Sequence, residues 1–255
     1  MTEFRAAKVP PQMVDIFKKA EITISGFFEN VTCYPERGRI EIDKDRYMWI
    51  RADSLAFFRN VLEDVYGEKG TDQILYKFGR AVGQQEAKKF HRKFGIETPL
   101  EKLSAGPVYF SYSGWAFVDI LPASAPSSDE SYLLTYHHPG SFEAEPFLTS
   151  ERKTNRPICH INAGYSAGWC AESFGVPLEA REITCTAHGD RKCTFLMSHR
   201  ATIVQRLEIL QNLLSQGRQI EDLKPEDLST QCQFIWDLVI PIIKRIMVLE
   251  KILIQ

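Results

Sequence analysis

Residues 156–195 read RPICHINAGYSAGWCAESFGVPLEAREITCTAHGDRKCTF, and this stretch decides the fold. Three of its cysteines and one glutamate could share a metal ion: Cys159, Glu182, Cys185 and Cys193. Zinc takes thiolate and carboxylate ligands, and a site closed by four protein ligands holds structure rather than catalysing a reaction. The sequence therefore predicts a structural zinc site.

The two downstream cysteines flank a turn. Residues 186–192 have a His-Gly-Asp centre, and such residues favour a tight turn that would bring Cys185 and Cys193 toward one ion. Cys159 would then pin a second element to this hairpin. Glu182 lies three residues before Cys185, so a regular strand would point the two side chains to opposite faces. We therefore expect a bulge or a strand end there.

The pattern extends beyond the four candidate ligands. AGYSAGW at 163–169, FG at 174–175 and E-x-x-C followed after seven residues by a cysteine at 182–193 are present. Together they resemble the 4-vinyl reductase domain, a small-molecule module that also stands at the front of bacterial regulators of aromatic-compound metabolism. The resemblance covers roughly residues 103–200 and continues more weakly over 13–99.

The resemblance implies which side chains bind the metal. In that family the corresponding Cys, Glu, Cys and Cys hold a structural zinc, which favours these four residues over the neighbouring His160 and His188. The alternative is that the cysteines are buried as small apolar side chains. Loss of the zinc should cost stability before it costs any chemistry.

Composition limits the classes of protein that fit. The chain has 255 residues, enough for one large domain or a domain with appendages, and 44% hydrophobic residues with 25% charged ones is ordinary for a globular protein. A net charge of −2 gives no basic footprint for nucleic acid. Six cysteines and an opening without an apolar run predict the reducing cytoplasm, where clustered cysteines more often bind metal than pair.

Local patterns predict helices and a hairpin over residues 1–100, the first of three expected regions. Residues 13–29 begin a helix, and 39–50 alternate around a charged turn as a hairpin should. An amphipathic helix follows from Asp53-Ser54 and ends near Gly67, and Thr71 opens another. Gly79 and Gly83 lie four residues apart on this second helix, a spacing that permits close packing against another backbone.

Residues 101–200 should form the ligand-binding and zinc-binding region. Residues 108–121 are aromatic and β-branched and predict a strand that pairs with 131–138; 157–174 predicts a helix, and 178–197 the zinc hairpin. The expected class is α+β, an antiparallel sheet packed against helices, with a zinc-stapled hairpin. Residues 201–255 should add a C-terminal helical tail, beginning with an amphipathic helix at 201–215.

The end of the tail is strongly apolar. Residues 234–254 contain charged side chains and Pro241, which argue against a membrane span. This segment either packs on its own domain or forms a dimerisation helix, and a homodimer is expected. In the related regulators an ATPase follows this position. Here no Walker-type loop or DNA-reading helix pair is found, so we expect signalling through a partner protein or the dimer and no direct nucleic-acid binding.

The resemblance also places a ligand pocket between the two central strands, the small-residue helix and residue 142. In phenol-sensing relatives a His and a Trp bond the ligand hydroxyl, and Phe110 and His138 align with them here. Because His137 and His138 are strand neighbours, at most one should enter the pocket. Ordinary core packing is the alternative for each aromatic. The predicted lining residues are Phe110, Tyr112, Trp115, Tyr136, His138, Phe142, Tyr165 and Trp169.

Two classes of function follow. The first is a carrier of a hydrophobic conjugated ligand, such as a bilin or other tetrapyrrole in photosystem or pigment assembly, with Cys170 as a thiol that could attach it covalently. The second is a sensor of small aromatic effectors that regulates a separate ATPase or transcription factor. A reductase is less favoured because the sequence has no G-x-G-x-x-G dinucleotide turn. We expect binding rather than catalysis.

Overall fold

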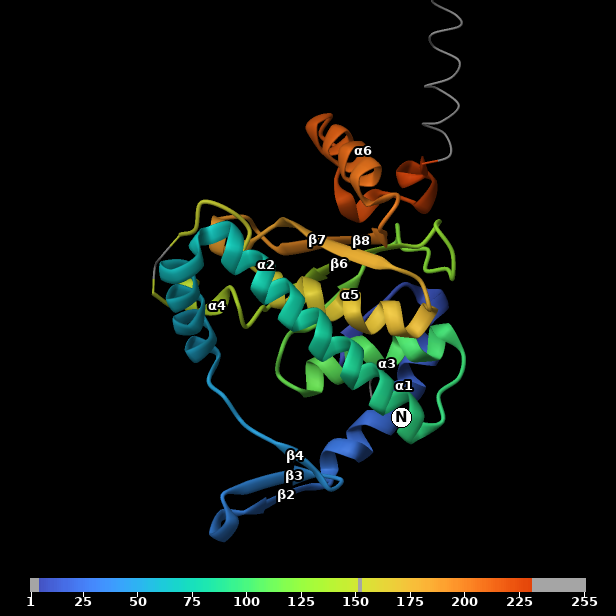
Figure 1. Ribbon diagram of the computed structural model, residues 1–255. Coiled ribbons are helices and arrows are strands. Elements are labelled where there is room, and N and C mark those ends of the chain that lie inside the picture. The colour runs from blue at the N-terminus through green and yellow to red at the C-terminus, as the bar shows by residue number, and fades with distance from the viewer. Residues whose placement is uncertain (1–4, 151–152, 231–255) are drawn as a thin grey trace, which may run out of the picture.

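The computed structural model describes residues 5–150 and 153–230 (Figure 1). Over these residues the larger sheet has five strands in the order β1-β5-β6-β8-β7, with β1 parallel to β5 and the other neighbours antiparallel. The strands are β1 (Ala7–Lys8), β5 (Val118–Ile120), β6 (Leu133–His138), β7 (Leu178–Thr184) and β8 (Cys193–His199). The predicted α+β class is confirmed. The apolar segment at 234–254 lies outside the described residues.

Helices cover both faces of this sheet. Figure 1 shows α5 and α2 below it, with α3 and α1 further down, and α6 above it. The helices are α1 (Val14–Glu29), α2 (Ala52–Phe94), α3 (Pro99–Tyr112), α4 (Glu145–Thr149), α5 (His160–Phe174) and α6 (Ile203–Ser215). Alternation along β6 separates two cores, because Leu134 and Tyr136 face the helices below while Leu133 joins the cluster under α6.

A smaller sheet projects from this body (Figure 1). Its strands are β2 (Val31–Tyr34), β3 (Arg39–Ile42) and β4 (Asp45–Tyr47), all antiparallel. Asp43 and Lys44, both at positive φ, make the two-residue turn between β3 and β4, so the predicted hairpin forms. An extended segment then leads to α2.

Helix α2 bends where the sequence predicted a break. Gly67 has φ 68° and ψ 172°, outside the helical region, and divides α2 into two helical parts. The second part packs directly on α5 through glycines. A Cβ at Gly83 would lie 2.2 Å from the Tyr165 carbonyl oxygen, and one at Gly168 would lie 2.2 Å from that of Arg80. The two backbones are therefore in contact, as the glycine spacing predicted, and α5 is fixed against α2.

The predicted strand at 108–121 is wrong over most of its length. Only Val118–Ile120 is a strand, and the residues up to Tyr112 belong to α3. Pro99 occupies the first turn of α3, and the Thr98 hydroxyl accepts a hydrogen bond from the Glu101 N–H, which are helix-start signals. Helix α3 is buried on most sides, so its aromatic and β-branched residues lack the one-sided pattern of a surface helix.

Candidate functional site

The three predicted thiols and the carboxylate meet in one cluster. Cys159 precedes α5, Glu182 lies on β7, Cys185 follows β7, and Cys193 begins β8. The register of β7 against β8 shifts between Glu182 and Thr184, which supplies the expected bulge and turns Glu182 toward the cysteines. One potential ligand atom from each of the four residues lies within 4.8 Å of all the others. This cluster could hold a metal ion.

The cluster passes a geometric test for a tetrahedral ion. The sulfur atoms of Cys159, Cys185 and Cys193 are separated by 3.9, 3.8 and 4.0 Å. Zn–S bonds of about 2.3 Å in a tetrahedron require about 3.8 Å between sulfurs. Glu182 Oε2 accepts a hydrogen bond of 2.7 Å from the Cys159 N–H, whereas Oε1 is buried and has no hydrogen-bond partner among the described residues. An orphaned carboxylate oxygen beside three thiols fits a cation ligand.

The electrostatics of the cluster also favour a cation. Burial raises the pKa of the Cys159 thiol and of the Glu182 carboxyl well above their usual values. Hydrogen bonds from the Cys159 and Cys185 thiols lower the pKa of Cys193 to about 5. Four anions cannot share this buried space without a countercharge, and a bound divalent ion would supply it as the protons leave.

Neighbouring groups hold the loop and exclude the competing histidines. The Cys185 N–H donates to Asp190 Oδ2 at 2.9 Å, and the Thr186 N–H lies 3.4 Å from Cys193 Sγ. His160 Nε2 lies 2.9 Å from a carboxylate oxygen of Asp72, and His188 contacts Asp190. Each imidazole is therefore directed to a carboxylate outside the ligand set.

Next to this cluster, on the inner side of β6, the core encloses a cavity of about 30 Å³. Four of the eight predicted ligand residues line it: Phe110, Tyr136, Tyr165 and Trp169. Cys170 also lines it, and burial raises the pKa of its thiol to about 12. The remaining lining residues, which sequence reasoning missed, are Leu103, Gly106, Pro107, Val118, Leu134 and Ser166.

Three more predicted residues surround the cavity wall. The Trp115 ring lies 5.1 Å from that of Tyr165 and 5.2 Å from that of Phe142. The His138 ring lies 5.5 Å from that of Phe110. These aromatic contacts place Trp115, Phe142 and His138 one layer behind the lining residues.

Tyr112 lies outside the cavity and packs on Phe28 at the surface. The physical reason is the helical backbone of α3. Residues 110 and 112 would share a face of a strand, but positions two apart on a helix point in different directions. Helical spacing from Phe110 back to Gly106 and Leu103 would have found the missed lining residues. Gly106 leaves room for the Trp169 indole, whose N–H donates to the Lys102 carbonyl at 2.8 Å.

The two strand histidines have different surroundings. His137 contacts Thr194 and Glu221 on the α6 side, at 3.0 and 3.1 Å. His138 is fully buried on the inner side, and in the described part of the chain neither ring nitrogen has a hydrogen-bond partner. Burial, with the neighbouring His137, lowers the pKa of His138 to about 3. A neutral imidazole with a free donor and a free acceptor therefore lies beside an aromatic cavity.

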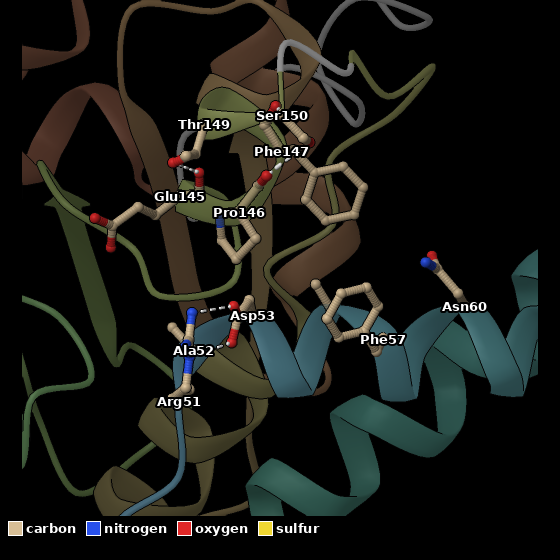
Figure 2. A pocket seen from close by; sticks show the side chains of 11 residues that line it. Arg51, Ala52, Asp53, Phe57, Asn60, Glu145, Pro146, Phe147, Thr149 and Ser150 are labelled. Carbon is tan, nitrogen blue, oxygen red and sulfur yellow. Dashed lines mark hydrogen bonds and ion pairs between the residues drawn. The ribbon is translucent and has the colours of Figure 1, made fainter.

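A larger hollow, not anticipated from the sequence, lies between the start of α2 and α4. It encloses about 670 Å³, and Figure 2 shows Phe57 of α2 and Phe147 of α4 on its two sides. Arg51 and Asp53 at its edge pair with each other at 2.7 Å. Its lining includes exposed side chains, among them Phe57, which distinguishes it from the buried inner cavity.

Known proteins match this chain in two segments. Residues 141–198 match the 4-vinyl reductase domain family, and residues 27–124 match the family described as activator of aromatic catabolism. The phenol regulator MopR of Acinetobacter guillouiae is 22% identical over 190 residues, which are 73% of this chain and 34% of that protein. The chain thus spans about a third of the length of this curated relative.

Two solved structures align with most of the chain. The phenol-responsive sensory domain of the transcription activator PoxR, solved with phenol, aligns with a TM-score of 0.62 at 19% identity, over 75% of this chain and 92% of that one. A vinyl-4-reductase family protein from Methanocaldococcus jannaschii aligns with a TM-score of 0.37 at 17% identity, over 78% and 98%. The chain therefore resembles 4-vinyl reductase domain proteins and has the fold of the sensory domain of an aromatic-responsive bacterial regulator.

Proposed function

We propose that this protein senses a small, uncharged aromatic molecule, which it binds in the cavity between α3, α5 and β6. The observation that carries the proposal is His138. Burying an imidazole without hydrogen bonds costs stability, so such a group in a folded protein calls for an explanation. A ligand hydroxyl that bonds to this imidazole provides one. The similarity to MopR and to the sensory domain of PoxR supports a ligand of this class.

The dimensions of the cavity favour a small ligand. A volume of about 30 Å³ is well below the roughly 300–1,000 Å³ of typical ligand pockets, so even a single-ring molecule requires the aromatic walls to shift. A tetrapyrrole would require a far larger rearrangement. The bilin carrier and its thioether to Cys170 stay predictions, and the raised pKa of that thiol does not favour them, because the thiolate is the reactive form.

The chemistry of the walls favours a neutral ligand. Aromatic and aliphatic side chains dominate the lining, and an ion brought into such surroundings would lose its hydration without a paired charge. His138 in its neutral form can donate from one nitrogen and accept at the other. A phenolic hydroxyl, which both donates and accepts, matches it better than a carboxylate does.

We also propose zinc as the ion in the cysteine cluster, in a structural role. The sulfur separations and the free Glu182 oxygen support a closed set of four ligands, which leaves no position for a substrate. Bound there, zinc would supply a link between α5 and the β7–β8 hairpin. The ligand cavity lies against both, so the metal would hold its walls.

The output of the sensor is proposed to pass to a partner. A homodimer and a separate ATPase or transcription factor are the expected partners, without direct contact to nucleic acid, and the cytoplasm is the expected location. Among the described residues no helix is long and apolar enough to cross a membrane.

Titration of the zinc-loaded full chain with phenol, and with toluene as the analogue that lacks the hydroxyl, tests the ligand proposal. We expect saturable quenching of tryptophan fluorescence by phenol, and weaker binding of toluene. His138→Leu should weaken phenol binding about 5–30-fold, the loss of roughly 1–2 kcal/mol from one hydrogen bond, and leave toluene unchanged. The matched variant Tyr112→Phe should change neither.

Two results would contradict the proposal. One is equal affinity of the wild type for phenol and toluene. The other is failure to bind either, combined with a saturable red shift of phycocyanobilin absorption, which would restore the tetrapyrrole carrier.

A further inference from the structure

Large apolar side chains gather on the outside of residues 48–66. Among the described residues of this segment, eight are exposed by between 49% and 82%: Met48, Trp49, Ile50, Phe57, Phe58, Val61, Val65 and Tyr66. We call this set the 48–66 surface. Largest apolar patches of monomeric proteins measure roughly 300–600 Å² and often carry a function.

The outward orientation of these side chains is fixed by the opposite side of the helix. Arg59 is buried, and its guanidinium donates to the Ile158 carbonyl at 2.6 Å and to Asp72 at 3.0 Å. Phe57, Val61 and Val65 follow each other at intervals of four residues and so form a row on the outer side. Because Arg59 holds the helix, this row cannot turn inward without breaking buried hydrogen bonds.

The first three residues of the 48–66 surface lie on an extended segment. Met48, Trp49 and Ile50 connect β4 to α2 and belong to no strand or helix of the described structure, as Figure 1 shows. Trp49 is 74% exposed. An exposed tryptophan on such a segment suits the role of an anchor that a partner pocket receives.

The open hollow beside α4 provides such a pocket on the same chain. Phe57, Pro146 and Phe147 line it, so it adjoins the 48–66 surface (Figure 2). Its volume of about 670 Å³ exceeds that of an indole side chain. Arg51, Asp53 and Glu145 at its edge have mixed charges, which gives no preference for a strongly acidic or basic partner.

We propose that a second copy of this chain covers the 48–66 surface, with residues 48–50 of each copy seated in the hollow of the other. A projecting anchor and a receiving hollow on one chain close into a two-fold dimer, in which each contact occurs twice. A partner of another kind would account for only one of the two features.

The area is sufficient for a stable dimer. A fully buried aromatic side chain contributes about 150–250 Å². At the observed exposures, roughly 100 Å² from each of eight side chains gives about 800 Å² per copy, the size of a standard interface. This interface rests on the proposed homodimer and is independent of the ligand. The small residues of α5, by contrast, are already used against α2.

The mass of the full chain over a range of concentrations, from light scattering and sedimentation equilibrium, tests the interface. We expect a dimer for the wild type, and dissociation constants at least 30-fold higher for Trp49→Asp and Phe57→Asp. Val204→Asp is the matched control, because Val204 is 63% exposed on α6, outside this surface. Circular dichroism and zinc content should be unchanged in all three variants.

A spectroscopic readout does not depend on a disruptive charge. The emission that Trp49→Phe removes from the wild type should shift to shorter wavelength as the protein is concentrated into the dimer. A monomeric wild type would overturn both the homodimer and the interface. A dimer that neither aspartate variant weakens, or that Ile243→Asp in the C-terminal segment dissociates instead, would overturn the interface and leave the homodimer standing.

Discussion

The Tyr165 hydroxyl donates a hydrogen bond of 2.6 Å to Glu86 on α2, and these two side chains separate the inner cavity from the surface. Tyr165 lines the cavity, while Glu86 lines an outer hollow of about 370 Å³ that Tyr47 and Tyr109 share. The hydroxyls of Tyr47 and Tyr109 lie 2.9 Å apart and join β4 to α3. A single layer of hydrogen-bonded side chains therefore stands between the proposed ligand site and solvent.

Tyr165→Phe should speed the exchange of ligand. Without the bond to Glu86 the ring can move more freely, so we expect phenol association and dissociation rates to rise several-fold together and the dissociation constant to change less than twofold. Stopped-flow tryptophan fluorescence measures both rates. Tyr112→Phe, at an exposed position, is the control. A change in the dissociation rate alone would mean that Tyr165 contacts the ligand rather than controlling access.

Cys185→Ser should release zinc and destabilise the fold. The serine hydroxyl does not replace a thiolate ligand, and the loss leaves the other buried ligands without a countercharge, so we expect several kcal/mol of stability to be lost. Metal analysis and thermal unfolding measure the two effects. Cys33→Ser, at an exposed cysteine, should change neither. One zinc per chain in Cys185→Ser would show that the ligand set is misassigned.

Gly83→Ala should be strongly destabilising although it adds one methyl group. The Cβ would lie 2.2 Å from the Tyr165 carbonyl oxygen, so α2 and α5 would have to separate, at a cost of about 1–3 kcal/mol or more. Gly26→Ala on α1 is the matched control, because its Cβ meets no atom within 4 Å. That variant should gain about 0.5–1 kcal/mol from helix propensity. Equal urea midpoints for the two variants would contradict the backbone contact.

Local signals explain which features the sequence could predict. The bulge at Glu182, the break at Gly67 and the turn at Asp43 each depend on residues close together in the chain. The zinc ligands were predicted by spacing and resemblance, and the structure brings their side chains together.

Tertiary packing explains the features that the sequence could not predict. Helix α3 was taken for a strand because its surroundings bury most of its surface, which hides the helical period. Tyr112 was misplaced by the same error. The exposed 48–66 surface looked like an ordinary amphipathic helix, since the pattern cannot tell which apolar residues the body leaves uncovered. The volume of the cavity likewise depends on contacts between distant segments.

Cys170 should resist alkylation in the native protein. Its thiol is buried and has a pKa raised to about 12, so hardly any thiolate exists at pH 8. Brief treatment with iodoacetamide followed by peptide mass spectrometry should modify the exposed Cys33 and leave Cys170 intact. Denaturation before treatment should make both react. Rapid native labelling of Cys170 would instead support its role as an attachment site.

His91 should make the fold sensitive to acid. Burial, with Lys102 nearby, lowers the pKa of His91 to about 4, and its ring packs edge-on against Trp169. The folded state therefore resists a proton that the unfolded chain accepts near pH 6.5, and this stability is lost as pH falls from 6.5 toward 4. At pH 5 the loss is about 2 kcal/mol relative to neutral pH.

His91→Leu should remove this part of the pH dependence. Because release of a bound metal also depends on pH, the informative quantity is the difference between variants in the free energy of unfolding at pH 7.5 and pH 5.0, from urea titrations. The wild type and the control His199→Gln should lose about 2 kcal/mol more than His91→Leu over this range. If all three lose the same amount, His91 is protonated in the folded protein, and its contact with Trp169 must tolerate the charge.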